Sequence, residues 1–145
     1  MVNINQNVNS EHPFLLMYDV LNNDEKLNSM LNDMRDKKDD NNMIFTYYIG
    51  ETYQKRELSP FIRLVPIVMV ESVWSDNDSP LYELSFSVEV FTQSLSDSYK
   101  LSSYITKLYK EQNCICYSVV PQYDETFDLY NSFMKFKIYV NKGDF

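Results

Sequence analysis

The segment from Leu81 to Thr92 constrains the fold of this chain more than any other. Its apolar side chains occupy every second position, namely Tyr82, Leu84, Phe86, Val88 and Val90. The positions between them carry polar side chains, namely Glu83, Ser85, Ser87 and Glu89. Because successive side chains of a strand point to opposite faces, this alternation predicts a β-strand with one buried and one solvated face.

Further strands are predicted on both sides of this segment. The apolar run Phe61–Glu71 contains Pro66, which cannot donate a ladder hydrogen bond, so we expect a strand at a sheet edge or one bulged near the proline. The polar turn over residues 75–80 then makes an antiparallel hairpin with the alternating segment. Other strands are predicted over Met43–Ile49, Cys114–Val120 and Asn131–Asn141. Pro121 is expected to end the second of these.

Helical spacing of apolar residues occurs near the N-terminus and in the middle of the chain. The first stretch begins at Pro13 and breaks at Asn22–Asn23, where Asn23 can cap a second stretch, so the region is one kinked helix or two short ones. Residues 35–42 contain no apolar side chain and are expected to form a solvated loop. A later helix is predicted to begin after Ser94 or Ser96 as its N-cap.

Together these elements predict a single α+β domain over residues 13–145. Its centre is a mainly antiparallel four- to five-stranded sheet with two helices packed on one face. Residues 1–12 are rich in asparagine and too polar to fold alone. They are expected to form either a flexible arm or a segment that becomes ordered on a partner.

Composition narrows the class of protein further. The net charge of −8 argues against a protein that grips nucleic acid, because a protein that neutralises phosphates should be basic. No apolar run approaches the roughly 20 residues needed to span a bilayer. The N-terminus also lacks the charged and apolar regions of a signal peptide. The chain is therefore expected to be soluble and intracellular when made, without a membrane partner.

No motif in the chain predicts catalysis, a cofactor or a metal site. The chain has a single histidine, His12, so the commonest general base is almost absent. Cys114 and Cys116 would point to opposite faces of a strand, a poor geometry for a disulfide, and are interpreted as free thiols. The acidic turns at residues 76–78 and 124–128 supply too few fixed oxygen ligands for calcium.

The expected class is thus a structural or interaction protein and not an enzyme. Trp74 and Phe91 are large aromatic residues at the ends of predicted strands. They are candidate interface anchors, with packing in the core as the equal alternative.

The order of elements resembles that of the tail terminator (tail completion) proteins of long-tailed phages, especially those that infect low-GC Gram-positive hosts. The features that carry the resemblance are, in chain order, the N-terminal helix Pro13–Lys38, the strand ending at Trp74, the strand Tyr82–Phe91, the amphipathic helix, a short strand, the turn Asp124–Asp128 and the closing strand Met134–Val140. The charged loop, the extra segment Met43–Ile49 and the asparagine-rich arm depart from the family pattern. These departures leave open another neck (head–tail joining) protein, and a small phage-encoded protein-binding module is a further alternative.

The resemblance implies a virion protein of the tail or neck that is assembled in the cytoplasm of the bacterial host. It implies a homo-hexameric ring that caps the tail tube, stops its polymerisation and provides the head-binding surface. The implied partners are the tail tube protein and the head–tail connector protein. DNA would pass through the ring without specific binding, and an acidic wall would keep it from adhering. Glu83 and Glu89 are accordingly candidate lumen residues.

Overall fold

The computed structural model describes residues 12–39, 41–73 and 81–141, and it confirms the predicted α+β class. The helices are α1 (Pro13–Asn22), α2 (Glu25–Met34) and α3 (Leu95–Lys110), with short 3₁₀ turns at Glu51–Tyr53 and Arg56–Leu58. The strands are β1 (Ile44–Thr46), β2 (Phe61–Val73), β3 (Leu81–Thr92), β4 (Ile115–Asp124) and β5 (Leu129–Asn141).

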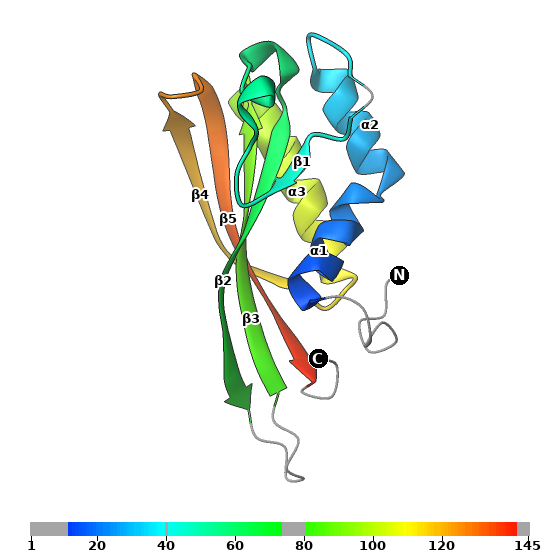
Figure 1. Ribbon diagram of the computed structural model, residues 1–145, viewed down its shortest axis with the longest axis vertical. Coiled ribbons are helices and arrows are strands. Elements are labelled where there is room, and N and C mark those ends of the chain that lie inside the picture. Colours follow the sequence, from blue (N-terminus) through cyan, green and yellow to red (C-terminus); the bar gives the residue numbers. More distant parts are fainter. Residues whose placement is uncertain (1–11, 40, 74–80, 142–145) are drawn as a thin grey trace.

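The strands form one five-stranded sheet in the order β1-β2-β3-β5-β4. Every pairing is antiparallel except the parallel pairing of β1 with β2. The three α-helices lie on one face of the sheet, and in the described ranges no α-helix covers the other face (Figure 1). The result is a layer of helices on a layer of sheet, as predicted, but with three α-helices in place of two.

The N-terminal helical region is two helices because both sides of the break are capped. Asn23 ends α1, and its backbone N–H donates to the carbonyl of Asp19. Asp24, and not the predicted Asn23, caps α2, since its Oδ2 accepts a 2.9 Å hydrogen bond from the backbone N–H of Leu27. Ser94 is the N-cap of α3 and thus the correct one of the two predicted alternatives.

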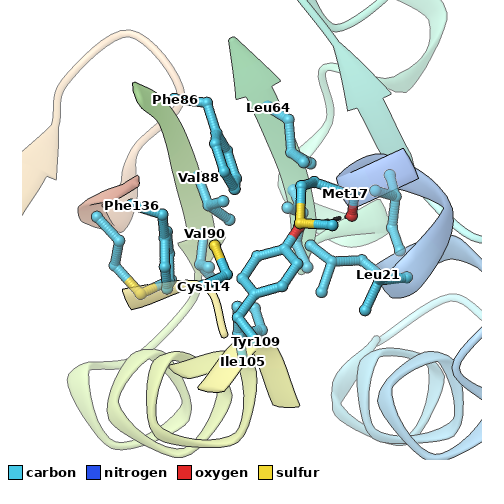
Figure 2. Close-up of a cluster of buried hydrophobic side chains, with 14 of the residues drawn as sticks. Met17, Leu21, Leu64, Phe86, Val88, Val90, Ile105, Tyr109, Cys114 and Phe136 are labelled. Atoms are coloured by element: carbon cyan, nitrogen blue, oxygen red, sulfur yellow. Dashed lines mark hydrogen bonds between the residues drawn. The ribbon is translucent and has the colours of Figure 1, made fainter. Parts of the chain in front are cut away.

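The main core lies between the helices and the central strands (Figure 2). Phe86 of β3 stacks on Phe136 of β5 with ring centroids 5.7 Å apart, and Tyr109 of α3 meets both rings edge-on. The hydroxyl of Tyr109 donates a 2.7 Å hydrogen bond to the backbone carbonyl of Met17 in α1. Burial raises the pKa of Tyr109 well above its ordinary value. Leu84, Phe86, Val88 and Val90 all belong to this core, so the alternation in the sequence predicted the helix-facing side of β3 correctly.

Three of the four polar side chains on the opposite side of β3 are buried too, although the sequence predicted that side to be solvated. Ser85, Ser87 and Glu89 are only 7%, 4% and 8% exposed. The reason is the central position of β3, which pairs along its length with β2 on one side and β5 on the other. Lys137 and Lys135 of β5 stand opposite Ser85 and Ser87, so each short serine side chain has a longer neighbour beside it.

Two predicted strand ends were wrong. β4 continues through Pro121, because β4 is an edge strand, and proline is tolerated in an edge strand where the missing N–H would point away from the neighbouring strand. Of the predicted strand Met43–Ile49, only Ile44–Thr46 pairs with β2, and Tyr47, with φ of 67°, turns the chain off the sheet.

Pro66 satisfies both options that the sequence left open. The register of β2 against β3 shifts between Pro66 and Val68, so the strand is bulged there. Since the short β1 pairs only with residues 62–64, the same part of β2 is also a sheet edge within the described ranges.

Arg35 is a further departure from prediction, because it is 3% exposed and not part of a solvated loop. Its Nε and Nη2 atoms each donate a 2.8 Å hydrogen bond, to the backbone carbonyls of Leu58 and Pro60 respectively. The side chain thereby joins the end of α2 to the start of β2.

Candidate protein-binding surfaces

The candidate functional sites among the described residues are surfaces. Across residues 12–39, 41–73 and 81–141, no three His, Cys, Asp or Glu side chains gather so that they could hold a metal ion. Cys114 and Cys116 are free thiols, as predicted, and burial raises the pKa of Cys114 well above its usual range. Over the same residues, no helix has both the length and the apolar character needed to cross a membrane.

The sheet face without helices is the first candidate surface, and we call it the open face. Its side chains, assigned from the strand register, are Arg63, Val65, Val68 and Val70 of β2, Glu83, Ser85, Ser87 and Glu89 of β3, Asn131, Phe133, Lys135, Lys137 and Tyr139 of β5, and Ile115 and Val120 of β4. Five apolar members near its margins are between 41% and 54% exposed, namely Val68, Val70, Tyr139, Ile115 and Val120. Exposed apolar side chains along the margins of a face indicate a protein-interaction surface.

Glu89 lies at the centre of the open face in a closed set of polar contacts. Its Oε1 accepts hydrogen bonds from Arg63, at 3.1 Å from Nε and 2.8 Å from Nη2. Its Oε2 accepts a 2.9 Å bond from the amide nitrogen of Asn131. The guanidinium of Arg63 also lies 5.6 Å from the ring centroid of Phe91. The charge of Glu89 is therefore offset within the chain, as a buried carboxylate requires.

The other candidate residues from the sequence lie in different environments. Glu83 is on the open face and partly exposed. Phe91 is fully buried in a second apolar cluster, where its ring centroid is 5.4 Å from that of Phe61 and 5.2 Å from that of Phe127. Phe91 thus packs in the core of the chain, which is the alternative weighed beside an interface role. Trp74 lies outside the described residues.

The charge of the open face is mixed. Arg63, Lys135 and Lys137 accompany the two carboxylates of β3, so the cations outnumber the anions there. The ammonium groups of Lys135 and Lys137 lie over the rings of Phe133 and Tyr117, at 5.8 Å and 5.6 Å from the centroids. Such contacts keep the lysine stems on the sheet surface.

The second candidate surface is an apolar groove of about 470 Å³ beside the outer edge of β2. One wall comes from the start of α1, with His12, Phe14 and Leu15, and Tyr47 stands beside it. The other wall is the bulged part of β2, residues 66–69. The exposed apolar side chains along this groove leave it open to another polypeptide segment.

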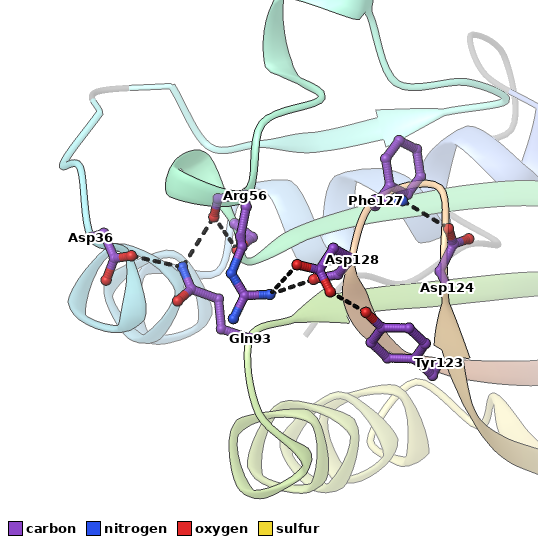
Figure 3. Close-up of polar contacts among 8 residues, drawn as sticks. Asp36, Arg56, Gln93, Tyr123, Asp124, Phe127 and Asp128 are labelled. Atoms are coloured by element: carbon purple, nitrogen blue, oxygen red, sulfur yellow. Dashed lines mark hydrogen bonds and ion pairs between the residues drawn. The ribbon is translucent and has the colours of Figure 1, made fainter.

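A polar cluster closes the end of the molecule at which β4 turns into β5 (Figure 3). Arg56 forms an ion pair with the carboxylate of Asp128 at 3.6 Å and also donates to its backbone carbonyl. The hydroxyl of Tyr123 donates to the same carboxylate, and this hydrogen bond raises the pKa of Tyr123. Gln93 donates 3.0 Å bonds to Asp36 and to the backbone carbonyl of Arg56. The cluster joins four segments that are distant in sequence, so its role is to fasten loops.

Sequence reasoning missed Arg63 and the apolar margins of the open face. Arg63 is the single charged residue between Phe61 and Val70, which is a usable signal, because an isolated cation in an apolar strand needs a nearby carboxylate. The apolar residues of β4 gave no such signal. Only the sheet order shows that β4 is an edge strand whose side chains remain exposed.

Comparison with solved structures shows a likeness that covers most of the chain. No protein-family model and no curated protein matches the chain. A solved chain from the virion of a native gene transfer agent (GTA) particle has a similar structure, with a TM-score of 0.60 and 10% sequence identity. The match covers 90% of this chain and 99% of that chain. The two proteins therefore share a fold over nearly their whole length.

Proposed function

We propose that this protein is a structural virion protein of a phage-like particle, and that it forms the ring that caps the tail tube. The observation that carries the proposal is the full-length fold likeness to a chain of a gene transfer agent virion. Because one fold can serve several functions, the surface of the subunit supplies separate support. The apolar margins of the open face are suited to a protein that works by assembling with others.

The β4 margin is the surface that we assign to contact between ring subunits. This edge strand exposes a row of apolar and aromatic side chains, namely Ile115, Tyr117, Val119, Val120 and Tyr123. An exposed edge is a liability in an isolated subunit, and head-to-tail contacts that close into a ring would bury it. Six copies are the number that the resemblance to tail terminators implies.

The acidic lumen is part of the same proposal, now with a narrower set of residues. The net charge of −8 on each subunit would act against adhesion of DNA to the ring as a whole. Glu83 stays a candidate for the lumen wall. The charge of the other candidate, Glu89, is offset by Arg63. A ring structure with Glu83 on its outer wall would contradict this assignment.

Oligomeric state provides the first experiment. Light scattering coupled to size exclusion, followed by electron microscopy of the peak, should give a ring of about six subunits. Val120→Glu should abolish the ring by placing a charge in the β4 margin, while circular dichroism stays unchanged. Leu95→Glu is the matched control, because Leu95 is 57% exposed on the helical side of the molecule. Ring loss in both variants, or in neither, would contradict the role of the β4 margin.

A tube-polymerisation assay tests the function itself. Added to growing tail tubes, the wild-type protein should bind tube ends and stop elongation, and Val120→Glu should not. A protein that binds the head–tail connector but leaves tube length unchanged would instead be another neck protein. No catalytic activity is part of the proposal.

A further inference from the structure

The outer edge of β2 is incomplete in a way that calls for a further strand. β1 pairs with Ile62–Leu64, and the backbone N–H of Tyr47 donates the last bond on that side, 2.8 Å from the carbonyl of Leu64. From Val65 to Val73, β2 pairs with β3 alone among the described residues. Unpaired edges of this length are normally covered or blocked.

The side chains beside this edge are also incompletely buried. Ile67 of β2 is 48% exposed, and Leu15 of α1 is 41% exposed. They face the groove of about 470 Å³ that separates β2 from the start of α1. An edge that offers both backbone groups and an apolar groove is the arrangement that binds an added strand.

The residues that directly precede the groove have the sequence of such a strand. His12 is part of the groove wall, so residues 1–11 enter the described structure at this place. From Val2 to Asn9, asparagine occupies every odd position, and the even positions hold Val2, Ile4, Gln6 and Val8. Alternation with period two predicts a strand with one apolar side, interrupted here only by Gln6.

We infer that residues 2–9 of the same chain add to the outer edge of β2 as a sixth strand, with Val2, Ile4 and Val8 turned toward the groove. β1 occupies the edge before Val65, and His12 lies beside residues 66–69. The added strand must therefore have its C-terminal end near His12 and its N-terminal end near Val73. Its chain direction is then opposite to that of β2, so the pairing is antiparallel. At roughly 3.3 Å per residue, residues 2–8 match the length of edge available after Pro66.

The position of Pro66 is consistent with an added strand on this edge and limits where its pairing can begin. Residues 62 and 64 use their backbone groups toward β1, so Pro66, two positions on, carries its missing N–H on the same outer side. The added strand gains no bond from Pro66 and begins its pairing after the bulge. The occupant is assigned to the same chain because His12 lies in the groove wall, so its effective concentration there exceeds that of any second copy.

Residue-resolved amide hydrogen exchange of the full chain tests the inference. In the wild type, amides of Val68–Val73 that point away from β3 should be protected at least tenfold relative to unstructured peptide, at every protein concentration. The double variant Ile4→Asp/Val8→Asp should lose this protection, because it places charges on the groove side. The matched control Asn3→Asp/Asn7→Asp adds the same charge on the other side and should keep it. Unchanged protection in α3 would show that each variant is folded.

Two results would overturn the inference. The first is unprotected outer amides of Val68–Val73 in the wild type. The second is protection that arises only as the protein concentration rises together with a dimeric mass, which would make the occupant the arm of a second copy. Neither result bears on tube capping, since the β4 margin lies at the opposite edge of the sheet.

Discussion

Arg63 and Glu89 face each other across β2 and β3, and the guanidinium Nη2 lies 2.8 Å from the carboxylate Oε1. The side chain of Glu89 is 10% exposed and that of Arg63 is 27% exposed, so water screens this ion pair only partly. The pair sits in the middle of the open face, where Asn131 satisfies the second carboxylate oxygen. It therefore links the central strand to both of its neighbours.

Removal of one partner of this pair should destabilise the protein. Arg63→Leu leaves a nearly buried carboxylate without its cation and should lower the free energy of unfolding by about 3 kcal/mol. The double variant Arg63→Leu/Glu89→Leu should recover much of the loss, because the uncompensated charge is gone. Urea unfolding measures both changes. Arg56→Leu is the control, since its pair with Asp128 is exposed and should contribute at most about 1 kcal/mol.

The hydroxyl of Tyr109 should contribute to stability through its contact with α1. Tyr109→Phe keeps the aromatic packing against Phe86 and Phe136 but removes the 2.7 Å hydrogen bond to Met17. A loss of about 1–2 kcal/mol in the free energy of unfolding is expected for a buried hydrogen bond. Tyr99→Phe, at a position that is 74% exposed, should change stability by less than about 0.5 kcal/mol. Equal effects of the two variants would argue against the Tyr109 contact.

Alkaline pH should lower the free energy of unfolding, because Tyr104 loses its proton. Desolvation by burial, together with the 2.6 Å hydrogen bond to Asp24, raises the pKa of Tyr104 to about 12 from an ordinary value of 10.0. A raised pKa means that the neutral hydroxyl is favoured in the folded state, so its contribution is fully present below pH 10 and is lost as the pH rises through about 12. The difference in unfolding free energy between the wild type and Tyr104→Phe should therefore shrink across that window. A difference that stays constant up to about pH 12 would contradict the assignment.

The two cysteines should differ in reactivity although they are two positions apart. Cys114 is fully buried, whereas Cys116 is partly exposed on β4. A maleimide should label Cys116 in the folded protein and Cys114 only after unfolding, because the reagent needs an accessible thiolate. Peptide mapping by mass spectrometry distinguishes the two sites. In folded Cys116→Ser, labelling of Cys114 at the rate seen for Cys116 in the wild type would show that the core around Cys114 is open.

Local patterns in the sequence predicted the elements well, because a period of two or 3.6 residues is a property of neighbours in the chain. The alternation in β3 and β5, the cap at Ser94 and the bulge near Pro66 all belong to this class. The break between α1 and α2 was located to within one residue, at Asn23–Asp24. What these patterns could not supply is the order of strands in the sheet.

Tertiary structure decided which of those residues are exposed, paired or available to a partner. Arg63 meets Glu89 across a sequence separation of 26 residues, and Arg35 reaches Leu58 across 23. Neither distance is encoded by a local period. Strand order made β3 central, which buried Ser87 on a face predicted to be wet, and made β4 an edge that tolerates Pro121. The sequence by itself thus determined the helices, the strands and which side chains share one face of an element. Packing between distant strands determined the surfaces, because burial depends on which neighbours stand beside a residue.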